Sequence, residues 1–493
     1  MKKVVSIHFL LCQLLVCTTA LLNAMEPKNT PDTFDQLTYD WTRTFAEVLQ
    51  LTNQKHYKPA TIDEAMMNAM DAFLNTLDQH SNFLKPKVHQ RMMESTTGTF
   101  CGVGIIIDNT RDSTRKEKDQ YLTIIDTVPG GPADKAGIEP MDKIVEIDGK
   151  SLGGISTDEI TTWLKGPRGT TVTIKVMRKE KPDLLSLTLT RDIIKEQNSL
   201  SFYLKDQNIY YLALSTFSQN AVNQVEELLK QATKNKYKGV ILDLRNNSGG
   251  LLNAVVDIAG MFVTKGSVVV TTKDKNNKVT NRYPTTRNPI LSDMPIFILI
   301  NNYTASAAEI LAGVLKIHAQ KGLTNNLHAF LIGTKTFGKG SVQEVIPVSN
   351  NCAIKLTTSL YFLPDDTTIQ GIGIEPDFIV ERTMPLTEQI RWFTQNYGRE
   401  ESFKNHIKVH VTDTAPNKAT STPSDQSAKR WSERAKDLLQ QDNQLRAAIT
   451  LINLLGTARQ SCPTLVANRD KAIQFMRQHL ITNDTQLTIE QVP

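Results

Sequence analysis

The spacing of hydrophobic residues predicts helices near the beginning of the chain. From Phe34 onward, apolar residues recur three and four positions apart, as on one face of an amphipathic helix. The residues on this face are Leu37, Trp41, Phe45, Val48 and Leu49. Similar spacing predicts a second helix over residues 65–77, which stops at the sequence LDQHSNFL, residues 77–84. We assign both helices to an N-terminal segment, residues 25–96, and expect them to pack against other parts of the chain.

The hydrophobic pattern changes near residue 97 to short alternating runs that are typical of strands. Four such runs, separated by turns rich in Gly and Pro, read GVGIIID, YLTIIDTV, KIVEIDG and TVTIKVM. A short amphipathic helix, DEITTWLK, lies among them. Residues 97–190 are therefore predicted to form a small β-rich domain.

Between about residue 200 and residue 380, apolar strands alternate with helices. The runs IYYLALS, KGVILDL and PIFILIN predict buried strands, and AVNQVEELLKQA, LLNAVVDIAGMF and SAAEILAGVLKI predict the helices that follow them. This alternation predicts an α/β core over residues 191–385. A polar linker follows at 386–430 and a helical C-terminal segment at 431–493. The predicted fold class is α+β, with several domains.

The first 24 residues match a secretory signal peptide. Lys2 and Lys3 precede an apolar run that ends in Ala24. Polar residues interrupt the run, which falls short of the roughly 20 clean apolar residues of a membrane-spanning helix. We predict cleavage after residue 24 and export to the periplasm or another compartment outside the cytoplasm. An uncleaved leader that anchors the protein to the membrane, or a lipid attached at Cys17, is the alternative.

Composition narrows the classes of function. The 493 residues suggest about three domains, and 40% of them are hydrophobic, which excludes a disordered chain. The net charge of +5 includes two lysines of the leader, so nothing electrostatic supports a nucleic-acid partner. Outside the leader the cysteines are Cys101, Cys352 and Cys462, an odd number without a CxxC pair. They predict neither a metal site nor a disulfide framework, and we expect three small buried hydrophobic residues.

Candidate chemistry begins with the loop RNNSGG, which follows a predicted strand and precedes a predicted helix. Gly249 and Gly250 free the backbone to point N–H groups into a cleft, and a helix N-terminus adds positive potential. This combination suits the stabilisation of an oxyanion. An ordinary strand-to-helix turn explains the two glycines equally well.

A second strand-end loop places Ser306 at the start of a predicted helix. Its neighbours Ala305 and Ala307 are small and leave the hydroxyl accessible. The helix dipole would favour the negative charge that develops during acyl transfer. On this segment alone a capping box is the simpler explanation, because Glu309 follows Ser306 by three residues.

A third loop holds Lys339 between two glycines, just before a predicted strand. Burial lowers the pKa of a lysine, and a neutral amine can accept the proton of a serine hydroxyl. If the strand begins near Lys339, Gln343 faces the same side and can hold the lysine in place. A phosphate-binding loop is a weaker alternative, because a strand and not a helix follows GKGS. A histidine base, His318 or His328, is another alternative, but neither has an obvious acidic partner.

In these three loops the chain resembles the carboxy-terminal processing proteases, also called tail-specific proteases. The matching blocks are LDQHSNFL, DLRNNSGG, TASAAEILAGVL, TFGKGSVQ and IQGIGIEPDFIV. The resemblance implies a crotonase-like α/β protease core with a Ser nucleophile, a Lys general base and a Gln that positions the Lys. On this chain these residues are Ser306, Lys339 and Gln343. The implied oxyanion donors are the backbone N–H groups of Gly250 and Ala307.

The chain departs from the family pattern at a few positions. Ser248 stands where proline is common, and Ala308 where serine is common. The stretch between Ser306 and Lys339 is also longer than the family suggests, and we place the extra residues in a loop around 321–329. None of these departures removes a reacting group.

Residues 97–190 resemble a PDZ domain, inserted ahead of the core. The sequence GVGI occupies the position of the loop that binds a carboxylate; its residues are Gly102, Val103, Gly104 and Ile105. The resemblance implies a groove that captures a C-terminal tail as an added strand. Arg168 is a further candidate for coupling to substrate, although a surface turn residue is equally consistent with LKGPRGT. A module that serves only as a gate or a dimer contact is the alternative for the whole domain.

Together these features predict an exported serine endopeptidase. It would act on proteins recognised by free, apolar C-terminal tails, through an acyl-enzyme and without a metal or other cofactor. A catalytically inactive PDZ adaptor on the same fold is the alternative from another class. An enzyme of related fold acting on acyl thioesters would explain neither the leader nor the PDZ-like domain. The sequence leaves a homodimer open.

Overall fold

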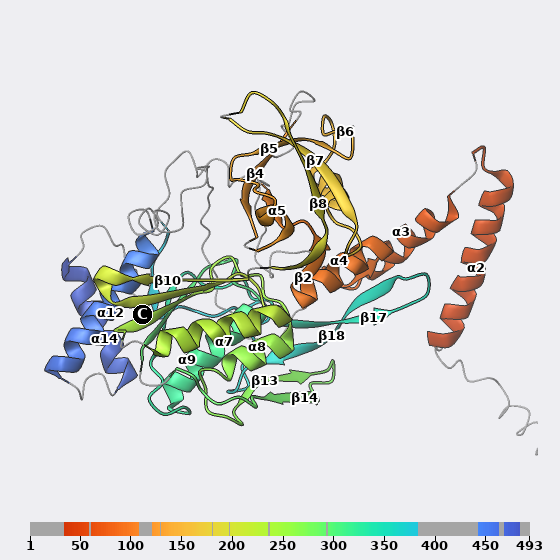
Figure 1. Cartoon of the computed structure of the whole chain (residues 1–493). Helices are drawn as coiled ribbons and strands as arrows, with labels where there is room; N and C mark the ends of the chain where they lie inside the picture. Colours follow the sequence, from red (N-terminus) through yellow and green to blue (C-terminus); the bar gives the residue numbers. More distant parts are fainter. Residues whose placement is uncertain are drawn as a thin grey trace, which may run out of the picture. The chain divides into compact units, whose positions relative to one another are not determined.

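The computed structural model describes most of the chain in two compact units, residues 1–70 and 71–493 (Figure 1). The described residues are 34–58, 61–107, 121–128, 130–179, 181–196, 198–234, 237–291, 294–382, 442–462 and 468–483. The predicted leader and most of the predicted linker, 386–430, lie outside these ranges.

Helix α2 (Phe34–Lys55) confirms the first predicted helix, and α3 (Ile62–Leu74) lies close to the second. The predicted packing of the first helix against other parts of the chain stays a prediction. Trp41 is 71% exposed, and Leu37, Phe45 and Val48 are exposed as well. An amphipathic pattern specifies an apolar face but not its partner. Within the described part of the first unit, no other element covers this face.

A six-stranded sheet forms the α/β core. In spatial order its strands are β10 (Ser199–Leu204), β11 (Ile209–Leu214), β12 (Gly239–Asp243), β15 (Ile296–Ile300), β16 (Ala329–Gly333) and β19 (Phe378–Ile379). All neighbours pair in parallel except β10, which runs antiparallel to β11. The ends of β12 and β15 lie within one residue of the prediction.

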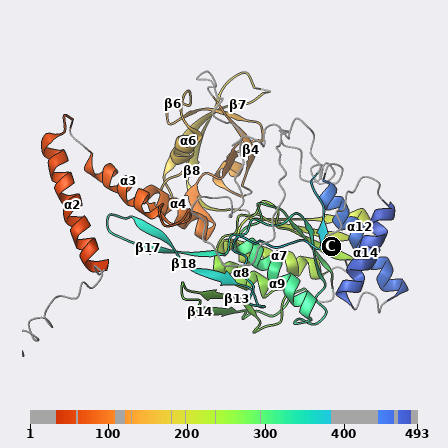
Figure 2. The ribbon, with the colours of Figure 1, turned by 180° about the vertical axis from the view of Figure 1, so that it is seen from behind.

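Both faces of this sheet are buried, which explains the uninterrupted apolar strands. On one face, Val240 and Leu242 pack with side chains of three helices. These helices are α7 (Gln219–Thr233), α8 (Leu252–Ala259) and α9 (Ala307–Lys321). On the other face, Ile241 packs with side chains of α12 (Asn443–Ser461) and α14 (Arg469–Asn483). Figures 1 and 2 show the first set in green to teal and the second in blue.

The C-terminal helix α12 is part of the core. Asp442 is its N-cap, and the side chain accepts a hydrogen bond from the Leu445 N–H at 3.0 Å. Leu451 and Ile452 are fully buried. The first part of the predicted helix, residues 431–441, lies outside the described residues. The chain therefore returns after residue 382 to cover one face of the six-stranded sheet.

A second sheet attaches the LDQHSNFL segment to the core. Its strands are β1 (Asn82–Leu84), β18 (Ala353–Phe362), β13 (Val268–Lys273), β14 (Val279–Pro284) and β17 (Ser341–Pro347), the last paired with β18. Strand β1 pairs with β18 in antiparallel register, Asn82 opposite Lys355. Helix α4 (Pro86–Thr97) follows β1. This pairing brings residues just before β1 close to the strand that follows Lys339.

The predicted β-rich domain is confirmed as a separate sheet with its own apolar core. Its main strands are β3 (Ile105–Ile107), β4 (Leu122–Thr127), β5 (Lys143–Ile147), β7 (Thr171–Met177) and β8 (Leu185–Thr190), with β6 (Lys150–Ser151) at β5. Two helices, α5 (Pro132–Lys135) and α6 (Thr157–Leu164), accompany it. Strands β2 (Thr99–Gly102) and β9 (Asp192–Lys195) form a short antiparallel ladder. This ladder joins the segments through which the chain enters and leaves the domain.

The cysteines correct one expectation. Cys352 is buried as predicted, but Cys101 is only partly buried and Cys462 is exposed, because it follows the last turn of α12. All three are free thiols.

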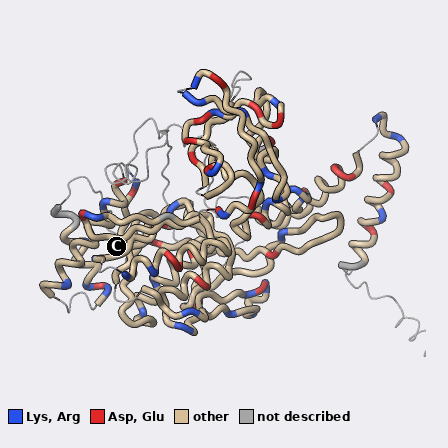
Figure 3. Tube along the Cα trace, in the orientation of Figure 1, with Lys and Arg blue, Asp and Glu red and all other residues tan. Residues whose placement is uncertain are grey.

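Charged side chains of both signs are interspersed along the described chain, as Figure 3 shows. Among the helices that the structure describes, none is both long and apolar enough to cross a bilayer.

Candidate active site

The three candidate loops meet at one edge of the six-stranded sheet. Strands β12, β15 and β16 are parallel neighbours, so the loops that leave their carboxyl ends lie side by side. These loops carry Gly249 and Gly250, Ser306, and Lys339. The extra residues between Ser306 and Lys339 lie in the loop between α9 and β16, at the opposite end of β16. They do not separate the two catalytic candidates.

Ser306 has an unusual backbone conformation. It immediately precedes α9 with φ 56° and ψ −119°, whereas an ordinary N-cap is extended. A non-glycine residue with positive φ is strained and persists only when its surroundings hold it. Here the Ala305 N–H donates to the Asn247 carbonyl at 2.9 Å, and the Thr304 hydroxyl donates to the Leu244 carbonyl at 2.9 Å. The loop after β12 therefore holds the serine in this strained conformation.

Gly249 is required by its closeness to Ser306. A β-carbon at position 249 would lie 2.8 Å from Ser306 Cβ and 3.0 Å from the Ala307 nitrogen. The φ of Gly249, 102°, is also one that other residues rarely adopt. Its N–H donates to Asn247 Oδ1 at 2.8 Å, which fixes the turn. The glycine is thus part of the site and not a generic turn residue.

Two backbone N–H groups in these loops are unpaired in the part of the chain that the structure describes. Within the described residues, neither the Gly250 N–H nor the Ala307 N–H donates to a protein acceptor. Ala307 is the first residue of α9. N–H groups at a helix N-terminus lack intrahelical partners, and this end of the helix dipole carries partial positive charge. Both groups are the oxyanion donors that the family resemblance implies.

The carboxylate of Glu309 joins the serine loop to the lysine loop. Its Oε2 accepts from the backbone N–H of Ser306 at 2.8 Å and of Lys339 at 2.9 Å. Its Oε1 accepts from the Thr336 hydroxyl at 2.6 Å and the Gly338 N–H at 2.8 Å. The nitrogens of Ser306 and Lys339 are therefore within about 6 Å of each other, since both bond the same oxygen.

Sequence reasoning recognised only one of the contacts of Glu309. The bond to the Ser306 N–H is the one a capping box predicts, but the other three partners lie 27 to 30 residues away. The side chain has no exposed surface, and burial raises the pKa of Glu309 to about 7 against the pull of these hydrogen bonds. All four partners donate, so the site is built for the ionised carboxylate.

Lys339 and Gln343 do not lie on one regular strand, contrary to the prediction from the sequence. Strand β17 begins at Ser341, and a bulge lies between Val342 and Gln343, so alternation along one strand does not relate the two side chains. Gln343 Nε2 donates to Ser341 Oγ at 2.9 Å and to Thr357 Oγ1 at 3.2 Å. Lys339 is partly buried in the loop before the strand.

Arg245, in the same loop as the glycines, is a residue that the sequence reasoning missed. It is bonded to Asp243 at 2.6 Å, to Asp442 at 2.7 Å and to the Gln444 side chain at 3.0 Å. The two carboxylates raise the pKa of the Arg245 guanidinium despite its burial. Asp243 also accepts from the Tyr211 hydroxyl at 2.6 Å. The N-terminus of α12 thus holds the start of the loop that carries Gly249 and Gly250.

The two histidines lie away from this edge. His318 is near the far end of α9, about 18 Å along the helix from Ser306. Its Nδ1 bonds the Thr324 hydroxyl at 2.9 Å, and burial lowers the pKa of the ring. His328 precedes β16 at the end opposite to Lys339. Neither supports a histidine base.

The predicted carboxylate-binding loop joins β2 to β3. Val103 is buried, and its carbonyl accepts from the Ala133 N–H at 2.9 Å. Gly104, with φ 74°, accepts from the Val128 N–H at 2.8 Å. Gly102 pairs with Asp192 in the β2–β9 ladder, and Ile105 opens β3 opposite Thr127. The loop is therefore fixed by its neighbours.

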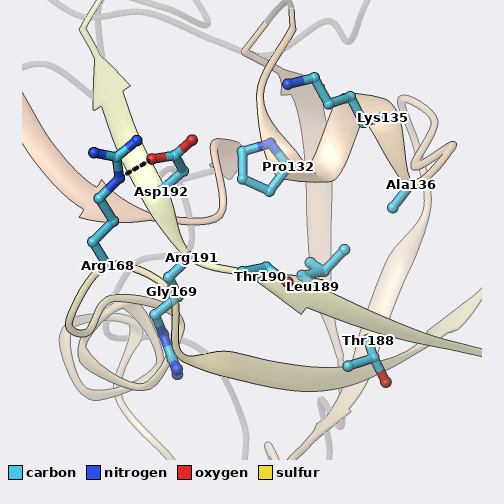
Figure 4. A pocket seen from close by; sticks show the side chains of 10 residues that line it. All are labelled: Pro132, Lys135, Ala136, Arg168, Gly169, Thr188, Leu189, Thr190, Arg191 and Asp192. Carbon is cyan, nitrogen blue, oxygen red and sulfur yellow. Dashed lines mark hydrogen bonds and ion pairs between the residues drawn. The ribbon is translucent and has the colours of Figure 1, made fainter.

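Arg168 lies behind this loop, on the surface. Its Nε bonds Asp192 Oδ1 at 2.7 Å, and that contact, after the Ile193 N–H, holds the pKa of Asp192 below its ordinary value. Both residues line an open cavity of about 490 Å³ in the β-rich domain. Figure 4 shows the ion pair at its rim. The structure places Arg168 beside the strand partner of Gly102 and not beside Ser306.

Comparison with known proteins gives consistent matches. Residues 208–380 match peptidase family S41, and residues 123–178 match a PDZ domain. A carboxy-terminal-processing protease of Bartonella bacilliformis is 33% identical over 378 residues, which cover 76% of this chain and 82% of that protein. A carboxyl-terminal-processing protease of Synechocystis is 34% identical over 340 residues, covering 68% and 75%. The solved photosystem II D1 C-terminal processing protease is 28% identical, with a TM-score of 0.39 over 68% of this chain and 86% of that one.

Substitution of Gly249 tests the closeness of the two loops. We expect Gly249→Ala to lower turnover on the order of 100-fold, because the added carbon pushes Ser306 away from its N–H donors. Gly266→Ala is the matched control, since Gly266 also has positive φ but no atom within 4 Å of the added carbon. Equal activities of the two variants would contradict this account.

The pKa of Glu309 predicts opposite effects of pH on stability and turnover. Because the folded-state pKa, about 7, exceeds the ordinary 4.5, the stability contribution of Glu309 is complete below 4.5 and is lost as pH rises through 7. Turnover should instead fall below pH 7, since the protonated Glu309 side chain cannot accept all four hydrogen bonds that join the two loops. Thermal midpoints at about pH 5 and about pH 8 should differ less in Glu309→Gln than in wild type. The exposed Glu227→Gln should behave as wild type; an unchanged pH dependence in Glu309→Gln would refute the assignment.

Proposed function

Since the chain belongs to the carboxy-terminal-processing serine proteases of peptidase family S41 and carries a PDZ domain, we propose that Ser306 is its nucleophile and Lys339 its general base. The observation that carries this proposal is that one oxygen of Glu309 accepts the backbone N–H of both residues. The strained Ser306 backbone at the start of α9 supports the same assignment. We further propose a crotonase-like core at 191–385 and a PDZ domain at 97–190.

The proposed reaction proceeds through an acyl-enzyme. The neutral amine of Lys339 takes the hydroxyl proton while Ser306 Oγ attacks the scissile carbonyl carbon. The carbonyl oxygen becomes an anion, which accepts from the N–H groups of Gly250 and Ala307. The C–N bond then breaks, and the leaving amine takes the proton from Lys339. A water molecule then attacks the ester carbonyl in the same way, giving its proton to Lys339. The C–O bond to Ser306 breaks, Ser306 Oγ takes the proton back, and the second product leaves. Gln343 is proposed to orient Lys339.

The PDZ domain is proposed to select the substrate. Its loop from Gly102 to Ile105 would bind a free C-terminal carboxylate, and the tail would add to the domain as a strand. We propose that tails ending in small or apolar residues are preferred, since Ile105, at the start of the strand that follows the loop, is an apolar residue that is only partly buried. Arg168 is a proposed coupling residue whose ion pair with Asp192 is next to the Gly102 strand.

The runner-up, an inactive PDZ adaptor, has less support. An adaptor needs no strained serine and no buried carboxylate shared between two loops. Both features cost free energy, and a binding module would gain nothing from retaining them. The experiment below separates the two functions directly.

Cleavage of a tailed substrate tests the proposal. The full chain is incubated with an unfolded protein that ends in apolar residues, and with the same protein ending in a C-terminal amide. Ser306→Ala and Lys339→Ala should each lower turnover on the order of 1,000-fold or more. Lys335→Ala, which removes a half-exposed ion pair with Glu375, should leave turnover near wild type. The amide should raise KM on the order of 10-fold with little change in kcat.

Each outcome assigns the function. Binding of the tail without cleavage by the wild type would establish the adaptor. Full turnover in Lys339→Ala would remove the lysine from the mechanism, and equal KM for both tails would remove the PDZ domain from substrate selection.

Export is a proposal that rests on the leader. We expect the protein recovered from its producing cell to begin at Met25, because cleavage after Ala24 fits the signal pattern. N-terminal sequencing of that protein checks this; recovery in the membrane fraction with Met1 intact would show an anchor instead.

A further inference from the structure

The side-chain amide of Gln343 has a defined direction in the structure. Its Nε2 donates to Ser341 Oγ at 2.9 Å and Thr357 Oγ1 at 3.2 Å. In the described part of the chain, no donor is bonded to its Oε1. The two ends of an amide differ in chemistry, since the nitrogen only donates and the oxygen only accepts. The groups that fix the nitrogen therefore determine where the acceptor oxygen lies.

Thr357 fixes the direction of the Gln343 amide because the Thr357 hydroxyl already donates its proton to another group. The Thr357 hydroxyl donates to Asp78 Oδ1 at 3.1 Å. A carboxylate can only accept, so the remaining lone pairs of the hydroxyl must face Gln343. Gln343 must then present N–H, as observed, and not its carbonyl. Ser341 imposes no such choice, because the hydroxyl of Ser341 can either donate to the amide or accept from it.

Asp78 is itself held firmly. Its Oδ1 accepts from the backbone N–H groups of His80 at 2.7 Å and Ser81 at 2.9 Å, and its Oδ2 accepts from the Ser81 hydroxyl at 2.7 Å. Ser81 Oγ in turn accepts from the Thr357 N–H at 3.1 Å. Asp78 is 5% exposed and Ser81 is fully buried. This closed turn, in the segment LDQHSNFL, lies against β18 through the pairing of β1.

We propose that Asp78 and Thr357 are positioning residues that set the orientation of the Gln343 amide, so that Oε1 is the end presented to Lys339. This inference rests on the proposed role of Gln343 as the partner of Lys339. It assigns a part in catalysis to a segment that precedes the PDZ domain and contributes no reacting group. Asp78 acts through two side chains and touches neither substrate nor reacting atom.

The direction of the amide matters for the charge on the lysine. With Oε1 toward it, Gln343 can accept a hydrogen bond from the amine during the reaction and leave the nitrogen lone pair for the Ser306 proton. A reversed amide points two N–H donors at the same amine, which misorients the lone pair and disfavours the ammonium. Lys355, opposite Asn82 on β18, also interacts with Asp78: burial lowers the pKa of Lys355, and the carboxylate only partly offsets this.

Paired substitutions of Thr357 in the full chain test the proposal. Thr357→Val removes the hydroxyl and lets the amide reverse, whereas Thr357→Ser keeps the hydroxyl and its bond to Asp78. We expect Thr357→Val to lower kcat on the order of 10-fold or more with KM unchanged. Its acid limb in the pH profile of kcat should move to lower pH, because the reversed amide lowers the pKa of Lys339. Thr357→Ser should match wild type in both respects.

A double-mutant cycle shows whether Thr357 acts through Gln343. In a Gln343→Ala background the effect of Thr357→Val should vanish. Full additivity of the two effects on kcat, or a Thr357→Val variant with wild-type kcat and pH profile, would overturn the proposal. If Thr357→Val unfolds, Asp78→Ala is measured in the same cycle with the same expectation. Wild-type activity of Gln343→Ala would instead defeat the proposed role of Gln343, so the two failures are distinguishable.

Discussion

The buried carboxylate of Glu309 is the interaction on which the site depends. An ionised group without exposed surface is stable only when donors surround it, and its four donors come from the loops after β15 and β16. Neither loop can move away without leaving a charge unpaired. The positive end of α9 favours the same charge, since Glu309 lies in its first turn. The geometry of the two proposed catalytic residues, Ser306 and Lys339, is therefore tied to the hydrogen bonds that stabilise the Glu309 carboxylate.

The sheet and its covering helices supply the frame for this arrangement. Parallel β12, β15 and β16 end at one edge, and both faces of the sheet are closed by helices. The loop after β12 holds the strained backbone of Ser306 in place, because the carbonyls of Leu244 and Asn247 accept hydrogen bonds from the residues just before it. Stability of the core and geometry of the site thus come from the same contacts.

Local patterns in the sequence predicted the features that depend on residues close together along the chain, such as the ends of strands and the start of a helix. Continuous apolar runs bounded by Asn and Gly located the ends of β12 and β15, and Ser306 was expected at a helix start. Contacts between distant segments were beyond such patterns. The bulge before Gln343, the further partners of Glu309 and the bond of Arg245 to Asp442 each depend on residues remote in sequence or on local irregularity. Helix α2 shows the converse: the pattern located the helix, but the described part of its own unit holds no partner for the apolar face.

The contact between Arg245 and α12 has a consequence for the order in which the enzyme is completed. Asp442 follows Arg245 by 197 residues, and the helix that it caps covers one face of the sheet. A chain made from its N-terminus carries Ser306 and Lys339 long before it carries Asp442. Until then the Arg245 guanidinium has only Asp243 as a carboxylate partner, and the apolar face of the sheet is open. The loop that carries Gly249 and Gly250 gains its full support last, so a nascent or truncated chain holds both proposed catalytic residues before this loop is fully supported.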